Sequence, residues 1–225
     1  MANKNVKEAQ QNEKVIVTVS KSEKFYNENK KTIWGIIIGI IVIALALLAY
    51  RKLIYEPKAA EAAAQMFPAE NAFAAGNFEV ALNGDGNNLG FTQIIDEYGK
   101  KAGNAAYMYA ATCNLQLGNW SEAIDFLKKY KTKDPIFAAR ALAATGDAYS
   151  GLEDYNTALS FYDKAVKAAD NAFAAGYLLK EGVIYEELGK SDKALECYKA
   201  IEDNYPQSIE AYDIAKYITR IEGVK

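Results

Sequence analysis

The sequence predicts an all-α protein in which a solenoid of paired helices follows a single transmembrane helix. Two observations predict this fold class. A run of 19 residues, 32–50, carries no charge and is almost continuously apolar, and an eight-residue phrase recurs later at intervals of 35 and 36 residues. The 225 residues are 51% hydrophobic and 24% charged, a globular composition rather than a disordered or collagen-like one.

The run from Ile33 to Tyr50 has the length and composition of a transmembrane helix. Eighteen helical residues rise about 27 Å, close to the roughly 30 Å of a bilayer's hydrocarbon core. Trp34 and Tyr50 stand at its two ends, where aromatic rings favour the headgroup level. A cleavable signal peptide fits less well, because some thirty residues precede the run. We therefore expect an uncleaved anchor over residues 33–50.

Residues 1–32 form a polar, Lys-rich N-terminal segment, for which we expect a mobile tail with helix from Ser22 onward. Within about 20 residues of the anchor, five lysines precede it and three basic residues follow it. This bias favours a cytoplasmic N-terminus with residues 51–225 on the other side of the membrane, which for a bacterial inner membrane is the periplasm.

The anchor also carries small residues at helical spacing, which would let another helix approach closely. This expected helix-packing face consists of Gly35, Gly39, Val42, Ala46 and Ala49. Glycine and alanine are common in transmembrane helices in any case, so both interpretations stay open.

After the anchor the chain repeats itself. The phrase Leu117–Ile124, Leu-Gly-Asn-Trp-Ser-Glu-Ala-Ile, recurs at Leu152–Leu159 and at Leu188–Leu195. Each phrase follows one helical pattern and precedes another, which predicts antiparallel helix pairs. The small residue of each phrase (Ala123, Ala158, Ala194) would permit a close helix crossing, with a bulky residue (Leu127, Tyr162, Tyr198) one turn later on the same face.

This pattern resembles the tetratricopeptide repeat. The resemblance extends through Gly146 and Tyr149 in the second repeat and Gly182 and Tyr185 in the third. The first repeat departs from it, with Ala111 and Asn114 at those positions. The resemblance to the tetratricopeptide repeat implies three clear repeats.

Two further segments complete the expected domain. Residues 51–103 hold a linker and a divergent repeat, whose second helix is interrupted by a Gly/Asn loop after Ala81 and resumes at Phe91. Residues 104–225 hold the three repeats and a C-terminal capping helix. For this cap we expect an apolar face made by Ile209, Tyr212, Ala215 and Ile218.

The sequence gives little support to an enzyme and predicts no cofactor. It contains no histidine, which excludes Ser-His-Asp, Cys-His and His-metal sites. Gly189-Lys190-Ser191 lacks the glycine that a phosphate-binding loop needs five positions earlier, where Ile184 stands. Cys113 and Cys197 lie in different repeats and are expected to be buried free thiols.

A repeat solenoid points instead to protein partners, and its mildly acidic main domain gives no reason to bind nucleic acid. In the tetratricopeptide fold the first helices of the pairs line a concave groove that commonly holds a partner segment. By position, the resemblance places in this groove Met108, Thr112, Arg140, Asp147, Leu179, Val183 and Glu186.

The order of tail, anchor and repeat domain resembles the YfgM-like bacterial inner-membrane proteins. The more particular marks are Leu89-Gly-Phe91 with Ile94 and Tyr98, the pair Gly103-Asn104, and Asn-Tyr-Pro206-Gln-Ser. This resemblance implies a non-catalytic adaptor at the SecYEG translocon that contacts secreted proteins and a periplasmic chaperone of the prolyl-isomerase type. The alternative is a scaffold for another cell-envelope assembly, in outer-membrane or cell-wall biogenesis.

Overall fold

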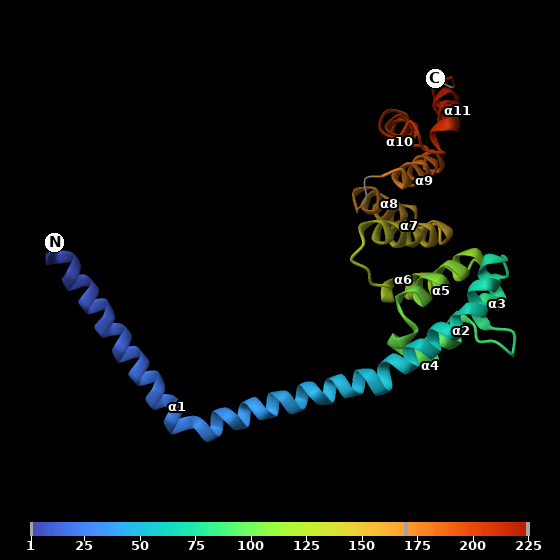
Figure 1. The fold of residues 1–225 in the computed structure, drawn as a ribbon. Coiled ribbons are helices and arrows are strands. Elements are labelled where there is room, and N and C mark those ends of the chain that lie inside the picture. The colour runs from blue at the N-terminus through green and yellow to red at the C-terminus, as the bar shows by residue number, and fades with distance from the viewer. Residues whose placement is uncertain (1, 169–170, 224–225) are drawn as a thin grey trace. The chain divides into compact units, whose positions relative to one another are not determined.

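The computed structural model describes residues 2–168 and 171–223, and every regular element within these ranges is a helix (Figure 1). The chain divides into two compact units, Met1–Pro57 and Lys58–Lys225.

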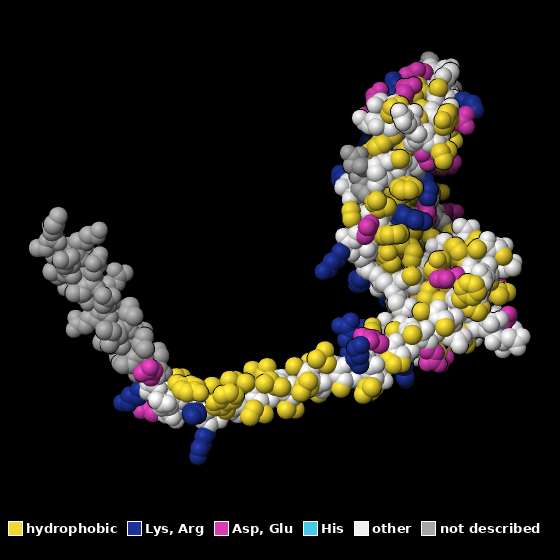
Figure 2. Space-filling model, viewed as in Figure 1, with side chains coloured by type: hydrophobic (Ala, Val, Ile, Leu, Met, Phe, Trp, Pro, Cys, Tyr) yellow, Lys and Arg dark blue, Asp and Glu magenta, His cyan; other side chains and the backbone are white. Residues whose placement is uncertain are grey.

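The first unit consists of one long helix, α1 (Ala2–Tyr50), and a π-helical turn, η1 (Arg51–Tyr55). The expectation that helix starts at Ser22 is wrong, because α1 already begins at Ala2. No Gly or Pro occurs before Gly35, so nothing in this segment interrupts helical hydrogen bonding. Among the described residues, one helix, within Glu23–Ala74, is long and apolar enough to cross a membrane, and none of its apolar window is buried (Figure 2).

The π-helical turn has a local cause in Pro57. In an α-helix the proline ring would clash with the carbonyl of Leu53, four residues earlier. In η1 the turn is wider, and the Glu56 N–H donates to the Arg51 carbonyl five residues before it. The Arg51 Nε also lies 3.2 Å from Glu56 Oε1 across this turn.

The second unit begins with the divergent pair that the sequence predicts. Its first helix is α2 (Glu56–Ala74), and its second is split into α3 (Phe78–Asn83) and α4 (Phe91–Tyr98), followed by the 3-10 turn η2 (Gly99–Ala102). The loop between α3 and α4 is held by Asp85, whose Oδ1 accepts from the backbone N–H of Asn87 (2.9 Å) and Asn88 (2.7 Å). The Asp85 carboxylate therefore stabilises the conformation of the loop that contains it.

Helices α5 to α10 follow as three regular pairs within the described residues (Figure 1). Their first helices are α5 (Asn104–Gln116), α7 (Pro135–Gly151) and α9 (Phe173–Glu187). Their second helices are α6 (Trp120–Lys129), α8 (Tyr155–Ala168) and α10 (Ser191–Asn204). Ala123, Ala158 and Ala194 are fully buried, which confirms the predicted close crossings.

Size complementarity holds each pair together. A Cβ added to Gly146 would lie 2.7 Å from Cε1 of Tyr162, and one added to Gly182 would lie 2.3 Å from Cε1 of Tyr198. The tyrosine rings therefore occupy the space that the glycines leave open. At the equivalent positions the first repeat has Ala111 in place of the glycine and the smaller Leu127 in place of the tyrosine, and both are buried.

The last helix, α11 (Ala211–Glu222), follows the third repeat and packs on it through Ile214, Ile218 and Ile221. This confirms a helix after the last repeat but corrects its predicted face. Ile209 is 84% exposed and Tyr212 is 85% exposed, and Ala215 is exposed as well. Ile209 precedes the helix, and the isoleucines at 214, 218 and 221 form an alternative stripe at helical spacing.

Candidate functional site

Six of the seven residues expected in the groove line two hollows on the first helices. The larger hollow, about 590 Å³, is lined by residues of α5–α9 and α11 and contains Asp147, Leu179 and Val183. Its walls include Trp120 and Tyr217, which the sequence analysis did not single out. The ring of Trp120 lies against Gly151, where an added Cβ would be 2.4 Å from the indole.

Asp147 is the polar centre of this larger hollow. Its Oδ1 accepts a hydrogen bond from the Tyr162 hydroxyl (2.7 Å) and another from Lys180 Nζ (2.6 Å). Burial, and secondarily the Asp147 charge, raise the pKa of Tyr162 above its usual range, so this hydroxyl stays a donor. The charge of Asp147 is thus neutralised within the domain, and the remaining walls are largely apolar.

The smaller hollow, about 260 Å³, contains Met108, Thr112 and Arg140. Its other walls are largely aromatic and comprise Phe73, Ala105, Tyr109, Tyr130 and Phe137. The Thr112 hydroxyl donates to the Met108 carbonyl (2.9 Å), whereas Arg140 has no acidic partner among the described residues. A guanidinium beside aromatic walls suits a carboxylate that is accompanied by an apolar side chain.

Glu186, the seventh residue, lies in neither hollow. Its Oε1 accepts from the Tyr198 hydroxyl (2.5 Å) and from the Arg220 guanidinium (2.6 Å). Because Arg220 belongs to α11, this carboxylate fastens the last helix to the third repeat.

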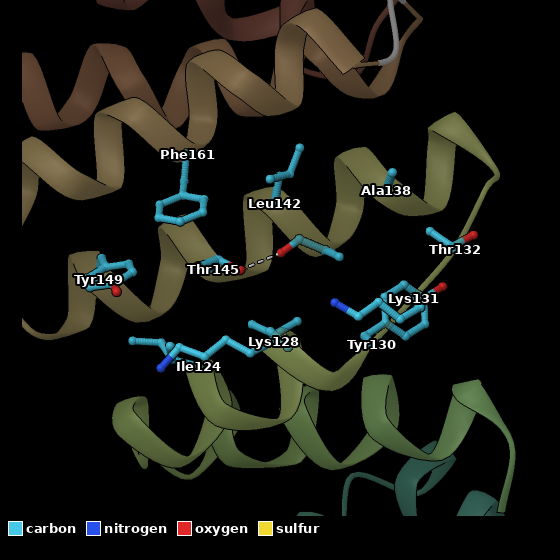
Figure 3. Close-up of a pocket in the computed structure, with 12 residues that line it drawn as sticks. Ile124, Lys128, Tyr130, Lys131, Thr132, Ala138, Leu142, Thr145, Tyr149 and Phe161 are labelled. Carbon is cyan, nitrogen blue, oxygen red and sulfur yellow. Dashed lines mark hydrogen bonds between the residues drawn. The ribbon is translucent and has the colours of Figure 1, made fainter. Parts of the chain in front are cut away.

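A further hollow of about 410 Å³ lies between α6, α7 and α8, and the sequence analysis missed it (Figure 3). Figure 3 shows Ile124 and Lys128 on α6 and Leu142, Thr145 and Tyr149 on α7 around it. It shares one lining residue, Tyr130, with the smaller groove hollow. The sequence carries a partial signal for it, because Ala141 and Thr145 stand where the next repeat has the larger Tyr177 and Glu181.

The remaining predicted features are placed as follows. Cys113 and Cys197 are both buried and free, as expected, and burial raises the pKa of each thiol to about 12. Within the described part of the chain no group of three or more His, Cys, Asp or Glu could hold a metal ion. On α1 the face from Gly35 to Ala49 is open, and a Cβ added at Gly35 or Gly39 would meet nothing within 4 Å.

Comparison with known proteins supports the repeat assignment. Two family models, both described as tetratricopeptide repeat, match residues 105–135 with 177–208 and residues 139–171. No curated protein matches the sequence. A solved structure described as "Crystal structure of MamA protein" aligns with a TM-score of 0.56 at 20% identity, covering 72% of this chain and 83% of that one.

A second structure, "Crystal structure of MamA", aligns with a TM-score of 0.51 at 20% identity over 69% of this chain and 92% of that one. At such identity the likeness concerns the fold alone. The family models, the spacing of the buried alanines and the glycine–tyrosine contacts agree with one another. The chain therefore carries a tetratricopeptide-repeat domain, a fold that serves as a scaffold for protein–protein interaction.

Proposed function

We propose that this protein is a non-catalytic, membrane-anchored adaptor that holds a segment of a partner protein in the groove of its first helices. The observation that carries the proposal is the pair of hollows on α5, α7 and α9. One holds the Asp147–Lys180 pair, and the other holds Arg140, which has no acidic partner in the described ranges. Apolar walls with few polar groups are typical of sites that bury a partner's side chains.

The partner class follows from the order of the segments. A Lys-rich N-terminal segment, an apolar helix and a repeat domain resemble the YfgM-like proteins, and by this resemblance the partners are the SecYEG-type translocon, secreted clients and a periplasmic prolyl-isomerase-type chaperone. Such an adaptor would sit in the bacterial inner membrane as a single-pass protein, with a cytoplasmic N-terminus and a periplasmic repeat domain. The Lys bias around the anchor supports this orientation.

A scaffold for another envelope assembly, in outer-membrane or cell-wall biogenesis, is the second candidate. The same groove would serve it, so the identity of the partners separates the two. The experiment is purification of the full chain from its native membranes in mild detergent, followed by mass spectrometry. Translocon subunits together with a periplasmic isomerase support the first proposal, and outer-membrane or cell-wall machinery supports the second.

Groove variants connect any recovered partner to the hollows. Val183→Glu places a charge in the larger hollow, and Arg140→Glu reverses the charge of the smaller one. We expect each to reduce partner recovery about tenfold, since an unpaired buried charge is costly at an interface. Lys133→Glu is the matched control, because it changes an exposed charge outside both hollows. Unchanged recovery with both groove variants would contradict binding in the groove.

A further inference from the structure

The hollow between α6, α7 and α8 exists because two side chains are small. In the next repeat the position of Ala141 is occupied by Tyr177, and that of Thr145 by Glu181, each 36 residues later. Tyr177 and Glu181 are both only 9% exposed. The equivalent space between α8, α9 and α10 is therefore closed, while the space at Ala141 and Thr145 stays open (Figure 3).

The open hollow has apolar walls and a basic rim. Its walls include Leu127, Leu142 and Phe161, and two lysines, Lys128 and Lys131, reach its edge from α6 and the following linker (Figure 3). Lys164 adds a third cation, with its Nζ 4.7 Å from the centroid of the Phe161 ring.

No residue that lines this hollow is acidic. The sequence around it has the same bias, since residues 126–131 contain three lysines and no carboxylate, although Lys128 also pairs with Asp125 (3.1 Å) just before them. In the next repeat, Asp163 stands at the position of Lys128. The lysine at this edge is therefore a feature of the open hollow and is not repeated at the closed space between α8, α9 and α10. An apolar side chain with acidic neighbours would complement it.

The same domain presents such a segment at its other end. Ile209 and Tyr212 are 84% and 85% exposed, although both are large and apolar. We call these two side chains the knob. Glu210 and Asp213 flank the knob, and residues 200–213 contain four acidic residues and no basic one, although Asp213 also pairs with Lys216. They are the two most exposed large apolar side chains of the described residues, and their closeness in sequence suits a small docking contact.

The knob is held in place by the fold. Ser208, immediately before it, is buried, and its Oγ accepts from the Ala211 N–H at the start of α11 (3.2 Å). The buried isoleucines of α11 fix the helix on the other side. The two side chains therefore project from an ordered turn, which lowers the entropy cost of docking.

From this complementarity we infer that the knob of one copy inserts into the hollow between α6, α7 and α8 of a second copy. The contact is heterologous, because knob and hollow are different surfaces, so a dimer keeps one free hollow on the first copy and one free knob on the second. A single contact of this size is weak, but membrane anchors confine the copies to one plane and raise their effective concentration. The inference concerns surfaces outside the proposed groove and stands independently of its ligand.

The test uses two variants of the full chain in mild detergent. Ala141→Tyr fills the hollow as Tyr177 fills its equivalent, and Ile209→Ser with Tyr212→Ser removes the knob. Both carry Gly35→Ile and Gly39→Ile, so that association through the anchor does not contribute. The parent with only the anchor changes should associate with rising concentration by sedimentation velocity.

Each variant alone should be monomeric, because every contact needs both surfaces. An equimolar mixture should form dimers and nothing larger, since one variant supplies the knob and the other the hollow. A parent that stays monomeric up to about 100 μM would overturn the inference. Variants that still associate alone, or a mixture that gives no dimer, would overturn it equally.

Charge variants keep the inference testable if Ala141→Tyr does not fold. Lys128→Glu with Lys131→Glu should weaken association about tenfold, and Glu210→Lys with Asp213→Lys in the partner copy should restore it. Lys133→Glu is the matched control and should leave association unchanged. Equal loss with Lys133→Glu would mean that net charge, not the hollow, governs association.

Discussion

At the scale of single residues, the contact between a first-helix glycine and a second-helix tyrosine leaves no room for a Cβ. We predict that Gly146→Ala costs about 1–2 kcal/mol, because the clash with Tyr162 exceeds the helix-propensity gain of about 1 kcal/mol. The first repeat has a larger and a smaller side chain at the two equivalent positions, Ala111 and Leu127, and both are buried. Gly146→Ala with Tyr162→Leu should therefore lose less than the sum of the single changes in urea unfolding. Strict additivity would contradict the proposed complementarity.

Glu181 gives the domain a pH dependence of stability. Burial raises the pKa of its carboxyl to about 7, the nearby Asp163 adds to the shift, and its Oε1 has no hydrogen-bond partner among the residues that the structure describes. Between the ordinary pKa of 4.5 and about 7, this carboxyl is protonated in the folded state and ionised in the unfolded state. The group therefore lowers the free energy of unfolding progressively across that pH range and by a constant amount above it. Glu181→Gln should stabilise the protein by on the order of 2 kcal/mol at pH 8 and hardly at all at pH 4.

Thermal unfolding at the two pH values measures this difference. Glu196→Gln is a useful control, because that carboxyl lies on the neighbouring helix α10 but is exposed. An equal gain at both pH values would show that the substitution acts by packing rather than by removing a titrating group.

At the scale of helices, the turns between the two members of each pair differ at one position. Gly118 and Gly189 adopt φ values of +77° and +69°, and in the second repeat the equivalent Glu153 adopts +60°. A left-handed conformation costs a residue with a Cβ about 1–2 kcal/mol. We predict that Glu153→Gly stabilises the domain by about 1 kcal/mol and that Gly118→Ala destabilises it by a similar amount. A loss of stability with Glu153→Gly would mean that the Glu153 side chain stabilises the fold by more than its left-handed backbone conformation costs.

The last helix provides a second prediction at this scale. Ile214→Ala should cost about 2–4 kcal/mol, because Ile214 is buried against the third repeat. Ile209→Ala should cost almost nothing, because its side chain is exposed. Chemical denaturation at a concentration where the protein is monomeric separates the two. Equal losses of stability for the two substitutions would favour the face that the sequence predicts, in which Ile209 is buried.

At the scale of the whole molecule, the core is divided among several clusters rather than gathered in one centre. One cluster lies in α2–α5, another in α7–α9 and a third in α9–α11. Because each repeat contacts mainly its neighbours, a defect should stay local. In Ile214→Ala we expect faster amide hydrogen exchange in α9–α11 and unchanged exchange in α2–α4. Uniform acceleration over the domain would indicate one cooperative unit instead.

The repeated phrase was sufficient to predict the paired helices, their close crossings and the buried free thiols, because these depend on residue types at fixed spacing. The groove residues were predicted by position, and six of the seven line two hollows. The seventh, Glu186, was also placed in the groove by position but lines neither hollow, because its carboxylate bonds to Tyr198 and to Arg220, which comes from a helix outside the repeats. The start of α1 was also missed, since a polar segment without Gly or Pro does not by itself reveal where helix begins.

The sequence by itself determined the elements and their order, because helical periodicity, small residues at crossings and glycine at turns act between near neighbours. Only the tertiary structure decided which stripe of the last helix is buried, since two stripes at similar spacing competed and packing against α10 selected Ile214, Ile218 and Ile221. The tertiary structure likewise decided that Ala141 and Thr145 leave a hollow while Tyr177 and Glu181 close its equivalent. A hollow is what remains when neighbouring helices have filled the space they can reach, and that depends on side chains from three helices at once.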